Sequence, residues 1–133
     1  MNFAKEETMN DEKRKILIVE DDSFVLDIYQ TKLTQEGFEV IAAANGMEAL
    51  GKLEKEKPDL ILLDIIMPYV DGLEVLKKVR SMDQLKDVPI ILLANLSQKE
   101  EVDQGMTLGA NDYLIKSHFT PSEVLKKINK YLK

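Results

Sequence analysis

The sequence predicts a doubly wound α/β domain in which five parallel strands are each followed by a helix. Three observations support this: five short apolar runs rich in Ile, Leu and Val, helical spacing between them, and helix-start signals before most of the helical stretches. Continuous apolar runs suit strands that are buried on both faces of a parallel sheet. Strict alternation of strands and helices gives right-handed crossovers and a helical layer on each face. The fold class is therefore (βα)5.

The predicted elements alternate along the whole chain. The strands are expected at residues 15–19, 39–44, 59–64, 89–94 and 112–116. Apolar residues spaced three or four apart mark one buried stripe on each intervening helix. The stripes comprise Val25, Tyr29 and Leu33; Leu50 and Leu53; Leu73, Leu76 and Val79; Val102 and Met106; and Leu125, Ile128 and Leu132.

Four of the helices have recognisable starts. In each, a capping residue is followed three positions later by Glu, a pattern typical of the first helical turn. The pairs are Asn45/Glu48, Asp71/Glu74, Ser97/Glu100 and Thr120/Glu123, and Pro121 takes the favoured first helical position. Gly37 and Gly109 fit helix C-terminal ends, where glycine is favoured.

The composition is that of one globular domain. Of 133 residues, 44% are hydrophobic and 32% are charged, and the net charge of −6 argues against direct nucleic-acid binding. The longest apolar run, residues 90–94, is too short for membrane insertion. With no signal-peptide core and no cysteine, we expect a cytoplasmic protein. We divide the chain into a flexible polar tail, residues 1–14, and one domain, residues 15–133.

Ionisable residues follow three of the predicted strands. Glu20, Asp21 and Asp22 come after the first strand, Asp64 ends the third, and Lys116 ends the fifth. The carboxyl ends of parallel strands form the ligand-binding edge of a doubly wound sheet, so these groups are expected to converge. When carboxylates lie so near one another, each disfavours the ionised form of the others. A divalent cation relieves this repulsion. Oxygen ligands with open positions suit Mg²⁺ better than Ca²⁺, for which no closed many-ligand loop is present.

This set of residues indicates phosphoryl chemistry. A carboxylate beside Mg²⁺ can act as a nucleophile toward phosphorus and form an acyl phosphate. Such transfer depends on positioning the phosphoryl oxygens and neutralising their charge, which Mg²⁺ and Lys116 would share.

Three motifs resemble those of the response-regulator receiver domains of two-component signalling, the CheY-like superfamily. They are "ILIVEDD", "LLDIIMPYVDG" (residues 62–72) and "GANDYLIK" (residues 109–116), and the resemblance covers residues 15–133. The spacing from Asp64 to Ala94, and from Ala94 to Lys116, also matches. The resemblance implies a flavodoxin-like sheet with strand order 2-1-3-4-5.

The resemblance also implies a role for each matching site residue. Asp64 would accept a phosphoryl group from a sensor histidine kinase or a histidine phosphotransfer protein. Asp21 would bind Mg²⁺ directly, Glu20 would act through water, and Asp64 and the backbone carbonyl of Ile66 would be further ligands. Lys116 would contact the phosphoryl group.

The signalling face is likewise implied by the resemblance. Tyr113 corresponds to the aromatic switch residue, whose ring moves between exposed and buried rotamers. The face formed by the fourth helix, the fifth strand and the fifth helix would bind a downstream protein or form a homodimer.

Three features depart from the family pattern. Ala94 stands where Thr or Ser is usual, so the hydroxyl that would bind a phosphoryl oxygen is missing. Ser117 replaces a proline that often follows a cis peptide, and we expect a trans bond before it because a cis bond to a non-proline residue costs roughly 2.5–4 kcal/mol. His118 is interpreted as a surface or loop residue. We expect a backbone amide of the loop, or water, to take the contact of the missing hydroxyl. Of the side chains, Asn95 is a better replacement than Ser97, which is expected to cap the fourth helix.

We interpret the chain as a stand-alone receiver domain or a fragment, and not as an enzyme. The alternative is a receiver-fold interaction module whose conformation is uncoupled from phosphorylation because of Ala94. A flavin-binding domain is disfavoured because "EDDSF" would repel a phosphate. A phosphatase is disfavoured because its usual second aspartate is Ile66 here.

Overall fold

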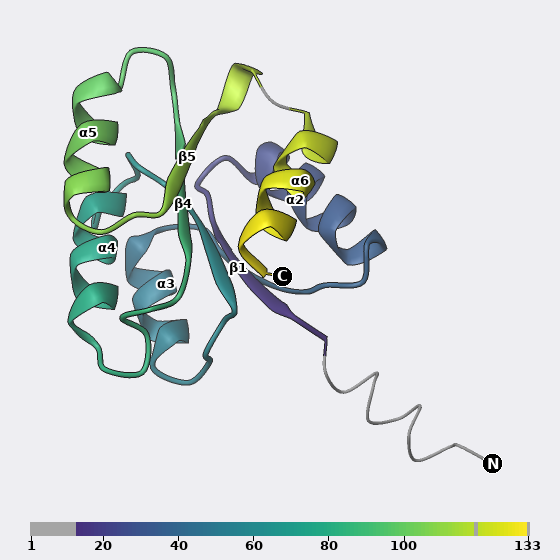
Figure 1. The fold of residues 1–133 in the computed structure, drawn as a ribbon, viewed down its shortest axis with the longest axis horizontal. Helices are drawn as coiled ribbons and strands as arrows, with labels where there is room; N and C mark the ends of the chain where they lie inside the picture. Colours follow the sequence, from purple (N-terminus) through teal and green to yellow (C-terminus); the bar gives the residue numbers. More distant parts are fainter. Residues whose placement is uncertain (1–12, 119, 133) are drawn as a thin grey trace.

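The computed structural model describes residues 13–118 and 120–132 and contains one five-stranded sheet (Figure 1). The strand order is β2-β1-β3-β4-β5, and every pair is parallel. The strands are β1 (Lys15–Val19), β2 (Glu39–Ala43), β3 (Leu60–Asp64), β4 (Ile90–Ala94) and β5 (Asp112–Ile115). The predicted fold class and strand order are confirmed. The tail expected at residues 1–14 lies, up to residue 12, outside the described part of the chain.

Within the described part of the chain, five helices cover the two faces of the sheet. They are α2 (Ser23–Gln35), α3 (Gly46–Leu53), α4 (Gly72–Ser81), α5 (Lys99–Thr107) and α6 (Pro121–Leu132), and a short 3-10 turn, η1 (Lys116–His118), follows β5. Helices α2 and α6 lie on one face and α3, α4 and α5 on the other (Figure 1). Across residues 13–118 and 120–132, no helix is long and apolar enough to cross a membrane.

The core consists of two apolar layers, one on each face of the sheet. Alternate residues of the central strands contribute to opposite layers, because successive side chains of a strand point to opposite faces. Leu17, Ile61 and Leu63 pack with helices α3 to α5, whereas Ile16, Leu60 and Leu62 pack with α2 and α6. Strands β3 and β4 are buried along their whole length, which explains their continuous apolar sequence.

Three of the four predicted helix starts are confirmed. Asn45 and Asp71 each accept the backbone N–H three residues on, at 2.8 and 3.1 Å. Thr120 and Glu123 form a reciprocal capping box. Gly37 and Gly109 follow helices with positive φ angles of 95° and 115°, as glycine allows.

The predicted cap at Ser97 is wrong. Helix α5 begins at Lys99, its N-cap position is Gln98, and no side chain caps it. A turn closed by the Gln98 N–H donating to the Asn95 carbonyl, at 3.1 Å, delays the helix.

The predicted stripe on α5 is also partly wrong, because Met106 is 38% exposed. A Cβ at Gly105 would lie 2.4 Å from a Leu92 methyl group, so the helix approaches the sheet at this glycine and turns Met106 outward.

Candidate functional site

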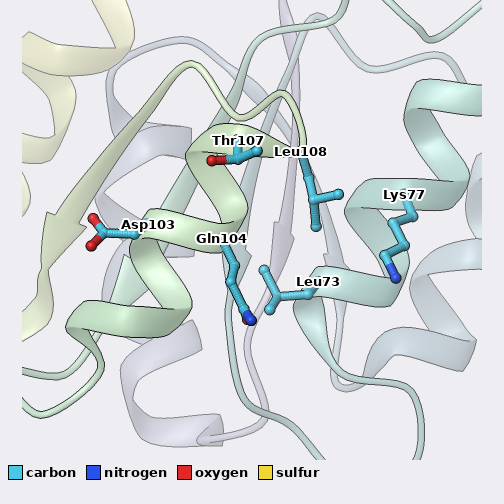
Figure 2. A pocket seen from close by; sticks show the side chains of 6 residues that line it. All are labelled: Leu73, Lys77, Asp103, Gln104, Thr107 and Leu108. Carbon is cyan, nitrogen blue, oxygen red and sulfur yellow. The ribbon is translucent and has the colours of Figure 1, made fainter.

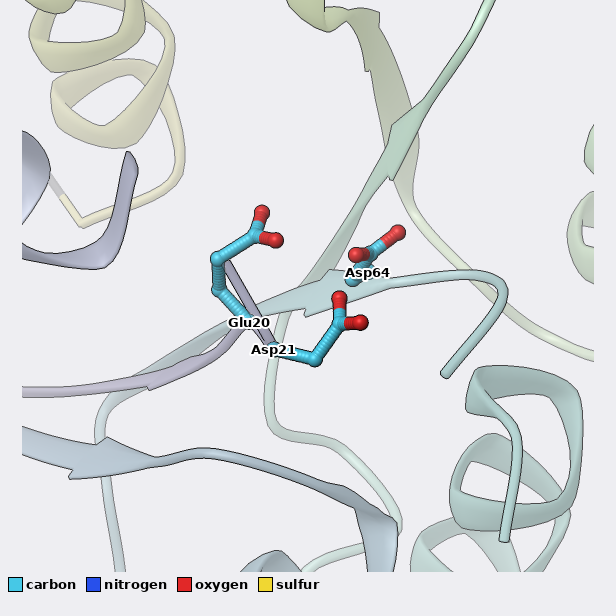
Figure 3. A group of neighbouring side chains, drawn as sticks. All are labelled: Glu20, Asp21 and Asp64. Atoms are coloured by element: carbon cyan, nitrogen blue, oxygen red, sulfur yellow. The ribbon is translucent and has the colours of Figure 1, made fainter. Parts of the chain in front are cut away.

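Three carboxylates converge at the carboxyl edge of the sheet (Figure 3). Glu20 and Asp21 follow β1, and Asp64 ends β3, the neighbouring strand. One oxygen from each lies within 4.8 Å of the others. Glu20 and Asp64 are buried, whereas Asp21 is exposed to solvent. Adjacent parallel strands therefore bring together the acidic residues that the sequence separates by more than forty positions.

Asp22, the third residue of the acidic run, has a different task. Its carboxylate caps α2 by accepting the backbone N–H groups of Phe24 and Val25 at 2.9 and 3.3 Å. Its own N–H donates to Glu20 Oε2 at 3.1 Å. Asp22 thus starts the helix and helps to hold Glu20, which leaves Glu20 and Asp21 as the acidic pair of the site.

Lys116 connects the two buried carboxylates. Its Nζ donates to Asp64 Oδ2 at 2.9 Å and lies 2.8 Å from Glu20 Oε1. The second contact is an ion pair with poor hydrogen-bond angles, so Glu20 Oε1 has no hydrogen-bond donor among the described residues. Three carboxylates thus face one ammonium group, and the site carries excess negative charge.

The pKa of Asp64 shows this imbalance. Burial raises it, the negative charge of Glu20 raises it further, and Lys116 offsets only part of this, so that the pKa is about 7. Burial alone would lower the pKa of Lys116, but its close contacts with the negative carboxylates of Glu20 and Asp64 hold that pKa above the usual value. Lys116 therefore remains charged, while the site favours a second cation or a proton.

The residues at this edge fit a Mg²⁺ ion. Mg²⁺ prefers oxygen ligands, typically one or two carboxylates completed by water and phosphate oxygens. A pocket of 460 Å³ is lined by all three carboxylates together with Ile66 and Lys116. The balance of charge gives further support, because three carboxylates share one ammonium group, that of Lys116, and a divalent cation would neutralise the excess.

The second half of the "LLDIIMPYVDG" motif positions α4 against Asp64. Asp71 caps α4, and the Gly72 N–H donates to the Ile65 carbonyl at 2.6 Å. A Cβ on Gly72 would lie 2.1 Å from the Asp64 carbonyl oxygen. Only glycine allows the helix to begin this close to the end of β3.

Ala94 ends β4 in the core, with its side chain fully buried and its Cα paired with that of Ile115. Of the two candidates to replace the missing hydroxyl, Asn95 lines the acidic pocket and is exposed. Ser97 is also exposed and does not cap α5.

Gln98 is a pocket residue that the sequence analysis missed. It is buried, and it lines the acidic pocket together with Asp64 and Lys116. Its Oε1 accepts the Asn95 backbone N–H at 2.8 Å. No sequence signal distinguishes it from a surface glutamine, because its burial follows from the turn over residues 95–98.

The remaining predicted residues lie near the edge of the site. Tyr113 is 42% exposed and borders a hollow of 230 Å³ that Leu96 and Val102 also line. No cis peptide bond occurs in the described residues, so the trans bond expected before Ser117 is confirmed. His118 is exposed in η1, as expected.

Another hollow, of 440 Å³, lies between α4 and α5 (Figure 2). Its lining includes Lys77 and Asp103 but no cluster of carboxylates. The convergent ionisable groups are instead those of the acidic pocket.

The fold and the acidic pocket define a class, the receiver-type α/β domains. The family model for the response regulator receiver domain matches residues 16–129. The chain belongs to this family, whose members act in two-component systems.

Curated relatives agree with this assignment. The chain is 41% identical over 125 residues to a probable transcriptional regulator, ycf27, of Pyropia yezoensis, covering 94% of this chain and 50% of that protein. It is also 41% identical over 122 residues to the alkaline phosphatase synthesis transcriptional regulatory protein PhoP of Bacillus subtilis, covering 90% and 49%. The chain spans about half the length of the curated relatives it matches.

Solved structures show the same fold. Chemotaxis protein CheY4 of Vibrio cholerae is 35% identical with a TM-score of 0.84, covering 90% of this chain and 99% of that one. The receiver domain of the Pseudomonas aeruginosa sensor histidine kinase PA1611 is 28% identical with a TM-score of 0.82, covering 90% and 98%. That structure has a magnesium ion coordinated in its active site cleft.

Proposed function

We propose that Asp64 is the phosphoacceptor of a Mg²⁺-dependent phosphorelay, and that a sensor histidine kinase or a histidine phosphotransfer protein supplies the phosphoryl group. The observation that carries the proposal is the 2.9 Å contact between Asp64 Oδ2 and Lys116 Nζ in a pocket lined with further carboxylates. A nucleophile, a fixed cation and a set of metal ligands share this pocket.

In the proposed step, a carboxylate oxygen of Asp64 attacks the phosphorus of a phosphohistidine. The new O–P bond forms as the P–N bond breaks, the electron pair goes to the imidazole nitrogen, and that nitrogen takes a proton from water. The products are an aspartyl phosphate and neutral histidine. Lys116 contacts a phosphoryl oxygen, which keeps its ammonium group paired after the Asp64 charge is lost.

Glu20, Asp21, Asp64 and the Ile66 carbonyl are the proposed holders of Mg²⁺. When bound, the ion supplies positive charge that offsets repulsion between the carboxylates and the incoming phosphoryl group. The excess negative charge of the pocket supports this assignment.

The proposed output surface is the face formed by α5, β5 and α6. Tyr113 lies on β5, and its exposed ring borders a hollow into which it can move. This face would bind a downstream protein or a second copy of the chain. Receiver relatives that continue into longer transcriptional regulators are consistent with such a role.

Ala94 supports a second candidate function. Its buried methyl group offers no hydrogen bond at the end of β4. The domain would then accept a phosphoryl group without a change in the conformation of α5, and would act as an interaction module. Unchanged amide resonances of α5 and Tyr113 after phosphorylation would favour this candidate.

The phosphoacceptor proposal is tested by intact mass. Incubation with acetyl phosphate and Mg²⁺ is expected to add one phosphate to the wild-type chain and none to Asp64→Asn. An unmodified wild-type protein that binds Mg²⁺ and is folded would refute the proposal.

A further inference from the structure

We propose that the side-chain amide of Gln98 donates to the phosphoryl group on Asp64, in place of the hydroxyl that Ala94 lacks. Gln98 is 8% exposed and lines the same pocket as Asp64 and Lys116. The inference rests on the proposed phosphorylation of Asp64 and identifies a further binding residue of that site.

The orientation of the Gln98 amide follows from its one hydrogen bond. Oε1 accepts the Asn95 backbone N–H at 2.8 Å, so Nε2, which carries two N–H donors, points elsewhere. Within residues 13–118 and 120–132, Nε2 has no hydrogen-bond partner. The residue is buried, but Nε2 is not among the fully buried unpartnered atoms, so this donor is accessible and free to bind a ligand oxygen in the pocket that Gln98 lines.

The chemistry of the pocket calls for such a donor. The side chains of Glu20, Asp21 and Asp64 are acceptors when ionised, and Lys116 is the one cationic group among the described lining residues. A phosphoryl group presents three oxygens. With Mg²⁺ and Lys116 each engaging an oxygen, the third favours a neutral donor from the side of β4 and α5, where Gln98 lies.

The neighbouring residues of the loop are poorer candidates. The Asn95 backbone N–H is already used by Gln98 Oε1, and the side chains of Asn95 and Ser97 are exposed. Gln98 is the one buried polar residue of the segment between β4 and α5.

A hydrogen bond from Gln98 to a phosphoryl group would also affect the output surface formed by α5, β5 and α6. Gln98 is the N-cap residue of α5, and its carbonyl accepts the Val102 N–H at 2.9 Å. Val102 and Leu96 line the hollow beside Tyr113. Drawing Gln98 toward a phosphoryl group would therefore shift the start of α5 and the walls of this hollow.

The decisive variant is Gln98→Glu. A glutamate can still accept the Asn95 N–H, so the turn is kept, but the donor is replaced by an anionic oxygen. Gln98→Met removes both functions without adding charge. Gln104→Glu is the matched control, because Gln104 is an exposed glutamine on α5 that lines the other hollow (Figure 2).

The direct readout is the NMR signal of the Gln98 side-chain amide in 15N-labelled protein with Mg²⁺ and beryllofluoride, a phosphoryl mimic. We expect one Nε2 proton to shift downfield on binding. The half-life of the phosphorylated protein, measured by intact mass over time, should fall at least about tenfold in Gln98→Glu and Gln98→Met, because each loses a charge-assisted hydrogen bond. It should stay unchanged in Gln104→Glu. Adding Ala94→Ser to Gln98→Met should restore part of it.

Two outcomes separate this inference from the proposed function. If the wild-type chain binds beryllofluoride and is phosphorylated, but the Gln98 amide does not shift or Gln98→Glu behaves as Gln104→Glu does, the role of Gln98 is refuted and that of Asp64 stands. If the folded wild-type chain binds neither beryllofluoride nor a phosphoryl group, both fail.

Discussion

The Lys116 ammonium donates to the Asp64 carboxylate at 2.9 Å, across the carboxyl edge of the sheet. Asp64 ends β3 and Lys116 follows β5, so the contact spans the end of β4, which lies between them. Strand β4 ends in Ala94, whose small side chain is buried in the core. The pair thus keeps the nucleophile and its cation together even though β4 supplies no polar side chain of its own at this point.

Replacing Lys116 tests the importance of this pair. Lys116→Met should slow phosphorylation by acetyl phosphate roughly 10- to 100-fold, because a hydrogen bond to a charged group is worth about 1.5–3 kcal/mol. The rate is measured by intact mass over time. Lys99→Met is the control, since Lys99 is a largely exposed lysine on α5. Equal rates for the two variants would show that Lys116 does not contact the phosphoryl group.

The raised pKa of Asp64 predicts a pH-dependent cost to stability. Asp64 has a pKa of about 7 in the folded chain, against 3.8 as the ordinary value. Between these values the unfolded chain binds fewer protons than the folded one, so this residue's contribution to stability falls as pH rises from about 4 to 7 and then levels off.

Asp64→Asn should remove that cost. Without Mg²⁺, we expect it to raise the free energy of unfolding by on the order of 2 kcal/mol at pH 8, and to change it little at pH 4. Urea unfolding in the presence of a chelator measures both values. An equal change in unfolding free energy at the two pH values would mean that burial and Glu20 do not raise the pKa of Asp64.

Ala94→Ser restores a hydroxyl at the end of β4. Because serine is only slightly larger than alanine, we expect a folded protein whose α5 and Tyr113 resonances shift further on beryllofluoride binding than those of the wild type. A response in the variant and none in the wild type would identify Ala94 as the point of uncoupling. If the α5 and Tyr113 resonances shift in neither protein, a residue other than Ala94 prevents the response.

Gly72→Ala should disturb the site through the backbone. Its Cβ would lie 2.1 Å from the Asp64 carbonyl oxygen, so we expect a loss of roughly 1–3 kcal/mol in unfolding free energy and slower phosphorylation. Gly51→Ala is the matched control, because a Cβ there meets nothing within 4 Å. On α3 this change should stabilise the chain by about 0.5–1 kcal/mol. Similar losses in both variants would contradict the close approach at Gly72.

Features that depend on burial or on neighbouring residues could be predicted from the sequence, whereas the turn before α5 could not. The apolar runs and helical stripes reflect burial, so they predict the (βα)5 fold and the convergence of Glu20, Asp21 and Asp64. Local capping at Asn45, Asp71 and Thr120 depends on neighbouring residues and is also predictable. The start of α5 was mispredicted at Ser97 because the turn over residues 95–98 competes with the cap. Gln98 enters the pocket through that same turn.

The most direct test of the central claim is to locate the phosphoryl group chemically. After treatment with acetyl phosphate and Mg²⁺, borohydride reduces an aspartyl phosphate to homoserine, and peptide mass spectrometry identifies the residue changed. We expect homoserine at position 64 in the wild-type chain, and none at this position when Mg²⁺ is chelated. Modification at another residue, or none at all in the folded Mg²⁺-bound protein, would contradict the assignment of Asp64 as the phosphoacceptor.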